Sequence, residues 1–342
     1  MDIGQQFLAL DAPLAIRSWL PDETLFSLAS RYHQISGNTH SGDTCRQLFG
    51  HTRQGALHDL PGNIGEFARR TGGILGEATE IARRRTVLAP YLPFLPHQAA
   101  VMAISALIET GVHNLKARLG LLTKGQRANH PLRACAACMQ ADKIEHCTMY
   151  WHREHQLPAV WVCPIHMEPL HTSDYKSEWL ARYRWGLPID PHVHLLPSGA
   201  ASNDATIDAA LQVANIAIKL ANLTENFRFS ETGIARCYRQ GLTEKGFGDV
   251  GQESETAQAQ HAYYHSLKSI QGIAPSSALP SSAEAAGTHI RRALDEKNLS
   301  PQIHRHVALI RWLFEDFDTF LTRYSSIGGD HAASAVDQRL EN

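Results

Sequence analysis

Two short pairs of metal-ligand residues constrain this chain more than any other feature. Cys135 and Cys138 form a C-x2-C pair, and Cys163 with His166 forms a C-x2-H pair, with residues 139–162 between them. Three thiolates and one imidazole are a donor set of tetrahedral structural zinc. Closing the loop adds little entropic cost, because that cost grows only with the logarithm of loop length. The pattern therefore predicts a structural Zn²⁺ site.

The fourth ligand stays open at this point, because the same stretch carries other thiol and imidazole groups. These alternatives are Cys147, His146, His152 and His155. A filled set of four protein ligands favours a structural site, since a catalytic zinc keeps one position for water. The competing interpretation is that the cysteines are ordinary small core residues, and that a chain with 20 histidines supplies a C-x2-H pair by chance.

A partial match to zinc deaminases lies inside the same stretch. His-Arg-Glu at 152–154 reproduces the H-x-E half of the deaminase motif, whose other half is P-C-x-x-C. Here the second half reads Cys-Pro-Ile-His at 163–166, and the C-x2-C pair lies upstream of H-x-E. This order argues against a deaminase.

Length and charge limit the remaining possibilities. With 342 residues the chain is long enough for two or three domains. Its 32 Lys and Arg nearly balance 34 Asp and Glu, so any contact with nucleic acid must be local. Of the six cysteines, four lie in or near the two ligand pairs, and Cys45 and Cys237 are isolated. This distribution favours metal binding in a reducing compartment over a disulfide framework. No stretch approaches the ~18 apolar residues of a membrane span, so we expect a cytoplasmic protein.

Hydrophobic periodicity predicts helices through an N-terminal region at 13–130. The first helix has apolar residues on one face and ends at Gly37, and the second spans 43–49 with Ser41 or Asp43 as its cap. Helices at 64–71 and 77–85, joined by a glycine turn, have the outline of a helix-turn-helix. Basic residues on this pair could contact DNA phosphates or a protein. They are Arg69, Arg70, Arg83, Arg84 and Arg85.

The zinc-binding element is predicted at 131–196, and its aromatic residues Tyr150, Trp151 and Trp161 are expected to cover the metal. A polar break at 197–206 separates it from a C-terminal helical region at 207–324.

Within that region, helices at 231–240 and 257–270 around a turn at 241–246 suggest a second helix-turn-helix-like unit. Its basic side would be Arg236, Arg239 and Lys245. Residues 272–288 are expected to be flexible, 301–324 to form one amphipathic helix, and 325–342 to be a disordered tail. The predicted class is therefore mainly α, with helix-turn-helix-like units around a small zinc-binding element.

The chain resembles the TniQ/TnsD family of transposon target-selection proteins. The resemblance rests on the two metal-ligand pairs and on motifs at 19–25 (Trp-Leu-Pro-Asp-Glu-Thr-Leu), 85–94 (Arg-Thr-Val-Leu-Ala-Pro-Tyr-Leu-Pro-Phe), 150–158 (Tyr-Trp-His-Arg-Glu-His-Gln-Leu-Pro), 162–166, 238–246 and 304–314. It implies a non-enzymatic adaptor that recruits an AAA+ ATPase of the TnsC or TniB type, which in turn brings the transposase. It also implies zinc ligation by Cys135, Cys138, Cys163 and His166.

Members of that family find their targets in different ways. Some bind a fixed attachment sequence themselves, and these tend to carry a long C-terminal extension, which this chain lacks. Others sit on an RNA-guided CRISPR effector, and some of these add a second zinc site with a C-x-C pair just after the first. No cysteine follows His166 at the corresponding place. Target DNA, a CRISPR effector with its guide RNA and a second copy of the chain are therefore all candidate partners.

Motifs for catalysis are missing from the sequence. It contains no phosphate loop of the G-x4-G-K-[ST] type and no recognisable acidic triad for two-metal phosphodiester chemistry. A transposition protein of this kind would act by binding. The alternative is a zinc-containing helix-turn-helix transcriptional regulator, which would bind palindromic half-sites as a dimer.

Overall fold

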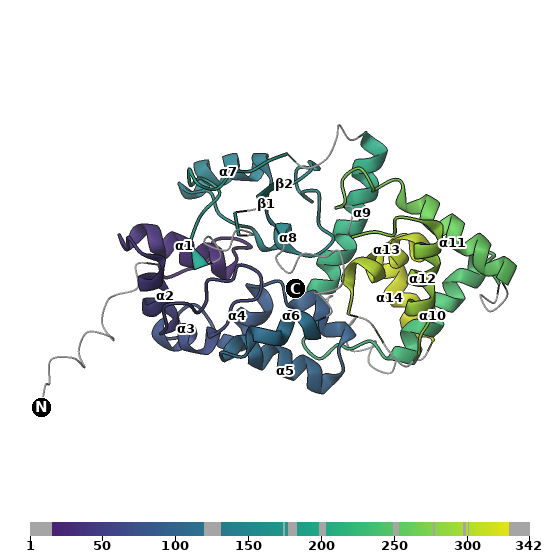
Figure 1. Ribbon diagram of the computed structural model, residues 1–342, viewed down its shortest axis with the longest axis horizontal. Helices are drawn as coiled ribbons and strands as arrows, with labels where there is room; N and C mark the ends of the chain where they lie inside the picture. Colours follow the sequence, from purple (N-terminus) through teal and green to yellow (C-terminus); the bar gives the residue numbers. More distant parts are fainter. Residues whose placement is uncertain are drawn as a thin grey trace, which may run out of the picture.

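Helices make up most of the chain, and they gather into two groups on either side of a long central helix (Figure 1). The structure is a computed structural model. It describes residues 16–119, 131–173, 175–176, 183–197, 203–248, 253–275, 278–296, 299 and 301–327. Among the described helices, none combines the length and apolar character that crossing a bilayer requires. The mainly α class predicted from the sequence is confirmed.

The first group of helices comes from the N-terminal third. It contains α1 (Leu25–Ile35), α2 (Ser41–Phe49), α3 (Ile64–Arg70), α4 (Ala78–Arg84), the 3-10 helix η2 (Ala89–Phe94), α5 (His97–Ile108), η3 (Val112–Asn114) and α6 (Leu115–Arg118). The Thr24 hydroxyl caps α1 by accepting the Ser27 N–H (3.0 Å), and Gly37, with φ of 70°, follows its end. The predicted apolar face of α1 is buried.

The cap predicted for α2 is wrong. The helix begins at Ser41, and its N-cap is His40, whose side chain makes no capping hydrogen bond. Asp43 lies inside the first turn and pairs with Arg46 (3.1 Å). An acid at this place interacts favourably with the helix dipole without being a cap.

The second structural unit is a small mixed element around a two-stranded sheet. It contains β1 (Leu132–Ala134), α7 (Ala136–His146), α8 (Arg153–Gln156) and β2 (His171–Ser173). The strands are antiparallel, with Leu132 opposite Ser173 and Ala134 opposite His171. An additional bridge joins Thr172 to Leu196, which places the chain beyond β2 beside the same sheet.

The C-terminal group begins with the central helix. It contains α9 (Asp204–Ala221), α10 (Glu231–Glu244), α11 (Glu253–Leu267), α12 (Ala283–Ala293), α13 (Ile303–Phe314) and α14 (Phe317–Ser326). The Asn203 side chain caps α9 by accepting the Thr206 N–H (2.9 Å). In Figure 1, α9 lies between the N-terminal helices and the helices α10 to α14.

Three predictions for this group are corrected. The turn expected at 241–246 is wrong, because α10 runs through Gly241, where a Cβ atom would lie 2.9 Å from the Phe314 ring. Residues 283–288, expected to be flexible, begin α12, because Ser282 caps an alanine-rich stretch that favours helix. The single helix expected at 301–324 is two helices, α13 and α14.

The break between α13 and α14 has a local cause. Glu315 has a φ of 70°, and the Asp316 carboxylate accepts the N–H groups of Asp318 (2.8 Å) and Thr319 (2.9 Å) as the cap of α14. Ser325 and Ser326 of the predicted tail belong to α14, whereas 328–342 lies outside the described residues.

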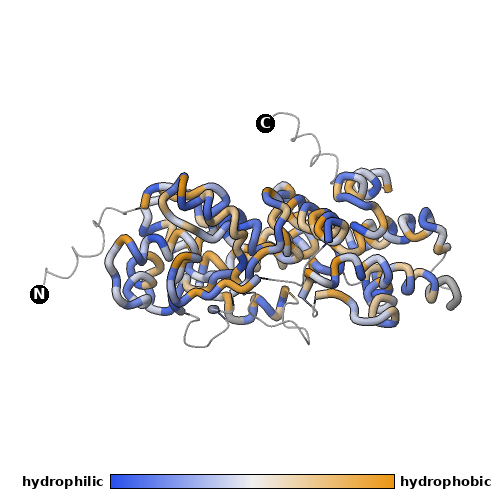
Figure 2. Tube along the Cα trace, turned by 90° about the horizontal axis from the view of Figure 1, so that it is seen from above, coloured by the Kyte–Doolittle hydropathy of each residue, from blue (hydrophilic) through white to orange (hydrophobic). Residues whose placement is uncertain are grey.

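One continuous cluster of buried side chains extends through the two groups of helices and the mixed element. At the contact between the groups, the Phe229 N–H donates to the Pro93 carbonyl (2.8 Å). Phe94 packs against Phe229 and stacks on His306, with ring centroids 5.0 and 4.2 Å apart. Figure 2 shows apolar segments, in orange, in the left-hand and right-hand halves of the molecule. The predicted regions 13–130, 131–196 and 207–324 therefore share a core, and their division into domains remains a proposal.

Replacing Asp316 by Ala should lower the free energy of unfolding by about 1 kcal/mol, because two helix N–H groups lose their acceptor. Urea denaturation followed by circular dichroism measures this change. Asp43→Ala is the matched control; it removes an exposed helical aspartate that does not cap, so a change below about 0.5 kcal/mol is expected. Equal effects of the two substitutions would contradict the assignment of the cap.

Candidate metal centre

The first cysteine pair lies at the junction between β1 and α7. Cys135 is the N-cap of α7, and its sulfur accepts the N–H of Cys138 (3.5 Å). Because Cys138 lies in the first turn of the helix, the two sulfur atoms lie on the same side of the helix start. The short strand β1, paired with β2, fixes the approach to this turn.

The second pair lies in a tight turn of the chain before β2. The Cys163 N–H donates to the Glu168 carbonyl (2.8 Å), and the Met167 N–H donates back to the Cys163 carbonyl (2.9 Å). Met167 adopts a φ of 55° to close this turn. The His166 N–H also approaches the Cys163 sulfur (3.5 Å), so backbone geometry alone brings both ligand side chains to one face.

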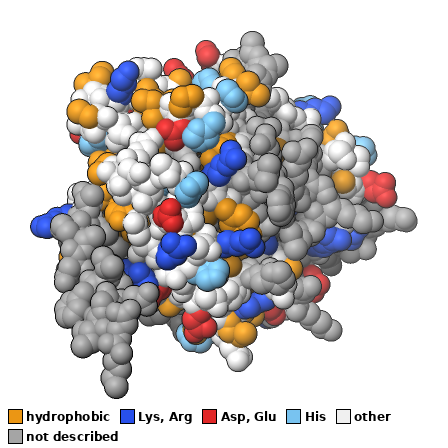
Figure 3. Space-filling view, turned by 60° about the vertical axis from the view of Figure 1, so that its left-hand side comes forward, with side chains coloured by type: hydrophobic (Ala, Val, Ile, Leu, Met, Phe, Trp, Pro, Cys, Tyr) orange, Lys and Arg blue, Asp and Glu red, His pale blue; other side chains and the backbone are white. Residues whose placement is uncertain are grey.

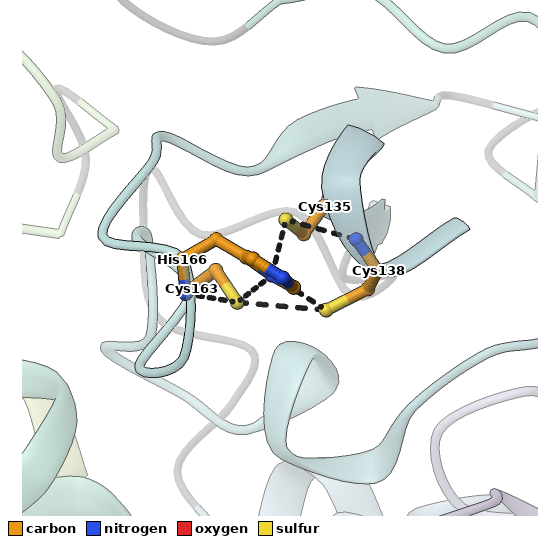
Figure 4. Close-up of side chains that lie close together, drawn as sticks. All are labelled: Cys135, Cys138, Cys163 and His166. Carbon is orange, nitrogen blue, oxygen red and sulfur yellow. Dashed lines mark hydrogen bonds between the residues drawn. The ribbon is translucent and has the colours of Figure 1, made fainter. Parts of the chain in front are cut away.

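The four side chains point toward one another, although they come from separate segments (Figure 4). The Cys138 and Cys163 sulfur atoms are 3.6 Å apart. His166 Nδ1 lies 3.5 Å from the Cys135 sulfur, 3.3 Å from that of Cys138 and 3.7 Å from that of Cys163. All four ligand atoms lie within 4.8 Å of one another.

These separations fit a tetrahedral ion. With metal–sulfur bonds of about 2.3 Å and a metal–nitrogen bond of about 2.0 Å, tetrahedral ligands are separated by about 3.8 Å between sulfurs and about 3.5 Å between sulfur and nitrogen. The spacing of the sulfur and nitrogen atoms is close to these values. The arrangement can therefore hold a metal ion, and the donor set of three thiolates and one imidazole suits Zn²⁺.

Burial and hydrogen bonding make the thiols unequal in acidity. The three cysteines are buried, and His166 is half-buried. The pKa of Cys163 is lowered because the neighbouring thiols of Cys135 and Cys138 can donate to its thiolate. The pKa of Cys138 is raised by its interactions with Cys135 and Cys163, because a second negative charge is unfavourable beside the first. A bound cation would relieve this repulsion.

The alternative ligands lie in other positions. Cys147 is exposed. His152 accepts or donates through Nε2 at 3.0 Å from Asp142, and His146 packs against the ring of Tyr150. His155 is the nearest alternative, with Nε2 at 3.9 Å from the Cys138 sulfur, and its burial lowers its pKa to about 3. The four-residue cluster contains His166 and none of these alternatives.

The aromatic side chains of this element are buried, and their covering of the metal remains a prediction. Trp151 is fully buried, and its Nε1 donates to the Gly186 carbonyl (2.7 Å). Tyr150 and Trp161 are also buried, with exposed fractions of 2% and 4%. These rings cannot stack on bases in this state, since a stacking platform has to be accessible to solvent.

The residues between the two pairs bind the N-terminal chain. The Thr24 N–H donates to the Trp151 carbonyl (3.1 Å), and the Trp151 N–H donates to the Ser27 hydroxyl (3.0 Å). Asp22 accepts the Arg153 N–H at its carbonyl (2.6 Å) and the Glu154 N–H at its carboxylate (2.8 Å). The metal-ligand cluster is therefore attached to the first helices.

Arg133 and Gln156 make a second connection inside the element. The Gln156 side-chain oxygen accepts the Arg133 N–H (2.9 Å), and its amide donates to the Arg133 carbonyl (2.7 Å). The buried Arg133 guanidinium donates to the carbonyls of Gln156 and Leu157, both at 2.9 Å. Pairing of this kind satisfies polar groups that burial would otherwise leave unbonded.

The basic residues predicted on α3 and α4 occupy different environments. Arg69 and Arg70 both bind the Glu66 carboxylate, at 2.7 and 2.5 Å, and lower the pKa of Glu66 to about 2. On α4, Arg84 is exposed, whereas Arg83 pairs with Glu225 (3.4 Å). Just beyond α4, Arg85 lies over the Trp19 ring, 4.5 Å from its centroid.

The basic residues predicted on the second unit lie on α10. Arg236 and Lys245 are exposed, and Arg239 pairs with Glu296. Their side chains are not gathered with those of α4. Figure 3 shows basic, acidic and apolar side chains interspersed on the face that it presents. All eight basic residues remain proposed contacts for nucleic acid or a partner. Those that are exposed are Arg69, Arg84, Arg236, Arg239 and Lys245.

Sequence reasoning missed the residues that support the cluster. His155 lies beside the ligands, and the pair of Asp142 and His152 joins α7 to the segment before α8. Burial lowers the pKa of His152, but its hydrogen bond to Asp142 overrides this effect and the net shift is upward. The motif at 150–158 contained both histidines, so their role as supports could have been proposed from its position between the pairs.

The fold and the cluster define a mostly helical protein whose N-terminal half contains a Cys3His cluster that can hold a metal ion. The sequence model of the TniQ family matches residues 17–170. The chain therefore carries a TniQ domain at 17–170, which indicates a transposition-associated protein. No curated protein matches the chain. The matched segment contains all four residues of the cluster.

Replacing Cys163 by Ser should reduce bound metal from about one ion per chain to near zero, because one ligand and its tight turn are lost. Metal content of the purified protein is measured by inductively coupled plasma mass spectrometry. Cys147→Ser is the control, since Cys147 is exposed and lies outside the cluster. Full metal content in Cys163→Ser, or its loss in Cys147→Ser, would contradict this ligand set.

Proposed function

We propose that the protein is a non-catalytic adaptor that selects target sites for DNA transposition. It would connect a target site, or an RNA-guided CRISPR effector on its target, to an AAA+ ATPase that recruits the transposase. The observation that carries this proposal is the TniQ match at 17–170, in a segment whose cysteines and histidine converge on one point.

We further propose that the metal is a structural Zn²⁺ held by Cys135, Cys138, Cys163 and His166. When bound, the ion would supply a cross-link between the start of α7 and the turn before β2. The residues around the ion attach this part of the element to the N-terminal chain, because the Trp151 carbonyl accepts the Thr24 N–H and the Trp151 N–H donates to the Ser27 hydroxyl. Four protein ligands fill a tetrahedral shell, which argues for a structural over a catalytic ion.

The mixed element would serve as a rigid base for protein contacts. Ile144, Ile165 and Met167 are large apolar residues of this element that remain exposed, at 84%, 69% and 59%. Two of them, Ile165 and Met167, flank the ligand His166 in the tight turn. Their position supports a binding role for the knuckle, because exposed apolar side chains on a rigid turn are typical of contact surfaces.

The helical pair α3–α4 supports the alternative of a zinc-containing helix-turn-helix regulator. The two helices pack together across a turn in which Gly72 and Gly73 have φ of 63° and 72°. However, both helices are only seven residues long, and Arg83 and Arg85 are held by other side chains of the protein. The TniQ match favours the adaptor.

Purification of the tagged protein from its native host should recover an AAA+ ATPase, identified by mass spectrometry. Nuclease treatment of the sample distinguishes targeting through an RNA-guided effector from direct binding to a DNA site. An ATPase that stays with a CRISPR effector and its RNA supports guided targeting, whereas loss of the ATPase with the DNA supports direct site binding.

The same purification is repeated with Cys163→Ser, the variant that is expected to bind no metal. Cys163→Ser should lose the ATPase together with the metal, because the element that presents the contact surface is no longer held. Cys147→Ser should keep both. Recovery of RNA polymerase or operator DNA without an ATPase would instead support the transcriptional regulator.

A further inference from the structure

A cavity of about 550 Å³ lies where the C-terminal end of α4 faces the loop between α9 and α10. Five of its lining residues are arginines, which come from three separate parts of the chain: Arg83, Arg84, Arg85, Arg153 and Arg228. In Figure 1, the end of α9 reaches the N-terminal helices at this place. We call this cavity the arginine pocket.

The arginine pocket has more positive charge than its own acids can balance. Glu225 is the one acidic side chain among its lining residues, and it lies 3.4 Å from Arg83. The Glu225 side chain is 70% exposed, so this pair is weak and easily opened. Outside the lining, Asp22 and Glu154 act on Arg153, and Glu23, Asp22 and Glu80 act on Arg85. The described lining itself carries a net positive charge, which favours an anion inside the pocket.

Several of the guanidinium groups are already held in place. Arg153 donates to the carbonyls of Thr86 (3.1 Å) and Arg83 (3.4 Å). Arg228 donates to the carbonyls of Glu225 (2.9 Å) and Phe227 (2.6 Å), and its buried Nε has no hydrogen-bond partner. Fixed, planar guanidinium groups bind carboxylates through paired hydrogen bonds, and they lose little side-chain entropy on binding.

The rest of the lining favours a peptide over a nucleic acid as the occupant. Leu92, Pro93 and Leu223 give the pocket an apolar side, and none of the described lining residues is aromatic. A single nucleic-acid strand usually needs aromatic rings on which its bases stack, and a duplex is too wide to enter a cavity of this size. Acidic side chains next to an apolar side chain match both parts of the lining.

We propose that the arginine pocket binds a short acidic and apolar segment of a partner protein. Its carboxylates would pair with Arg84, Arg153 and Arg228, and its apolar side chain would contact Leu92 and Pro93. Glu225 would compete for Arg83 until the segment displaces it. This inference goes beyond the proposed function, because the pocket would take such a segment whether or not the protein acts in transposition.

The test uses the full-length protein and a fluorescein-labelled peptide of alternating glutamate and leucine, with binding followed by fluorescence anisotropy. Arg84→Gln and Arg228→Gln should each weaken binding about tenfold, because each removes a charge-assisted hydrogen bond. Glu225→Gln should strengthen binding severalfold, because the competing carboxylate is gone. Arg291→Gln is the matched control, since Arg291 is an exposed arginine outside the pocket.

Arg84 and Glu225 are exposed, so their substitution should leave the thermal unfolding curve unchanged and exclude misfolding as the cause. A glutamine and leucine peptide should not bind. The proposal is overturned if the acidic peptide fails to bind at about millimolar concentration, or if Glu225→Gln does not strengthen its binding. It is also overturned if the arginine variants weaken binding of labelled single-stranded or duplex DNA but leave peptide binding unchanged, which would identify a phosphate site.

The outcome is independent of the adaptor proposal. Neither Arg84→Gln nor Glu225→Gln touches the metal ligands, so metal content and recovery of DNA or RNA can be measured on the same preparations. A protein that recovers an AAA+ ATPase but binds no acidic peptide would retain the proposed function and overturn the proposal for the arginine pocket.

Discussion

The hydrogen bonds between 151–154 and 22–27 are the constraint on which the rest of the structure depends. Two of them join backbone groups, and two are accepted by the side chains of Ser27 and Asp22. They attach the segment between the two metal-ligand pairs to the start of α1, while Arg153 reaches the Thr86 carbonyl beyond α4. The cluster at one end of this segment and the first helices at the other therefore form one unit. The extent of the TniQ match, 17–170, agrees with this unit and not with a separate knuckle.

The same attachment explains how the two groups of helices come to share a surface. Arg153 is fixed by the metal-binding element, Arg83 by α4 and Arg228 by the loop after α9, and all three line one pocket. Next to it, the contact of Phe94 with Phe229 and His306 joins the groups through buried rings. An occupant of the arginine pocket would touch both groups at once. Binding there would stabilise their relative position.

The sequence predicted the parts of the fold that depend on local chemistry. The C-x2-C and C-x2-H spacing identified the four clustered residues, because each pair closes its own turn. Apolar periodicity found α1, and glycines marked its end. Periodicity could not find the break before α14, because Phe314 and Phe317 are both buried and the interruption depends on the Asp316 cap. Nor could it show that Gly241 lies inside a helix, since that depends on the distant Phe314 ring. The arginine pocket was hidden for the same reason: its members are far apart in the chain.

The measurement that tests the central claim most directly is the X-ray absorption spectrum of the purified protein at the zinc edge. The claim is that one zinc ion holds the start of α7 to the turn before β2. The spectrum should then show three sulfur neighbours at about 2.3 Å and one nitrogen neighbour at about 2.0 Å. A shell of nitrogen and oxygen alone, a shell with two sulfurs and two nitrogens, or a protein without zinc would contradict it.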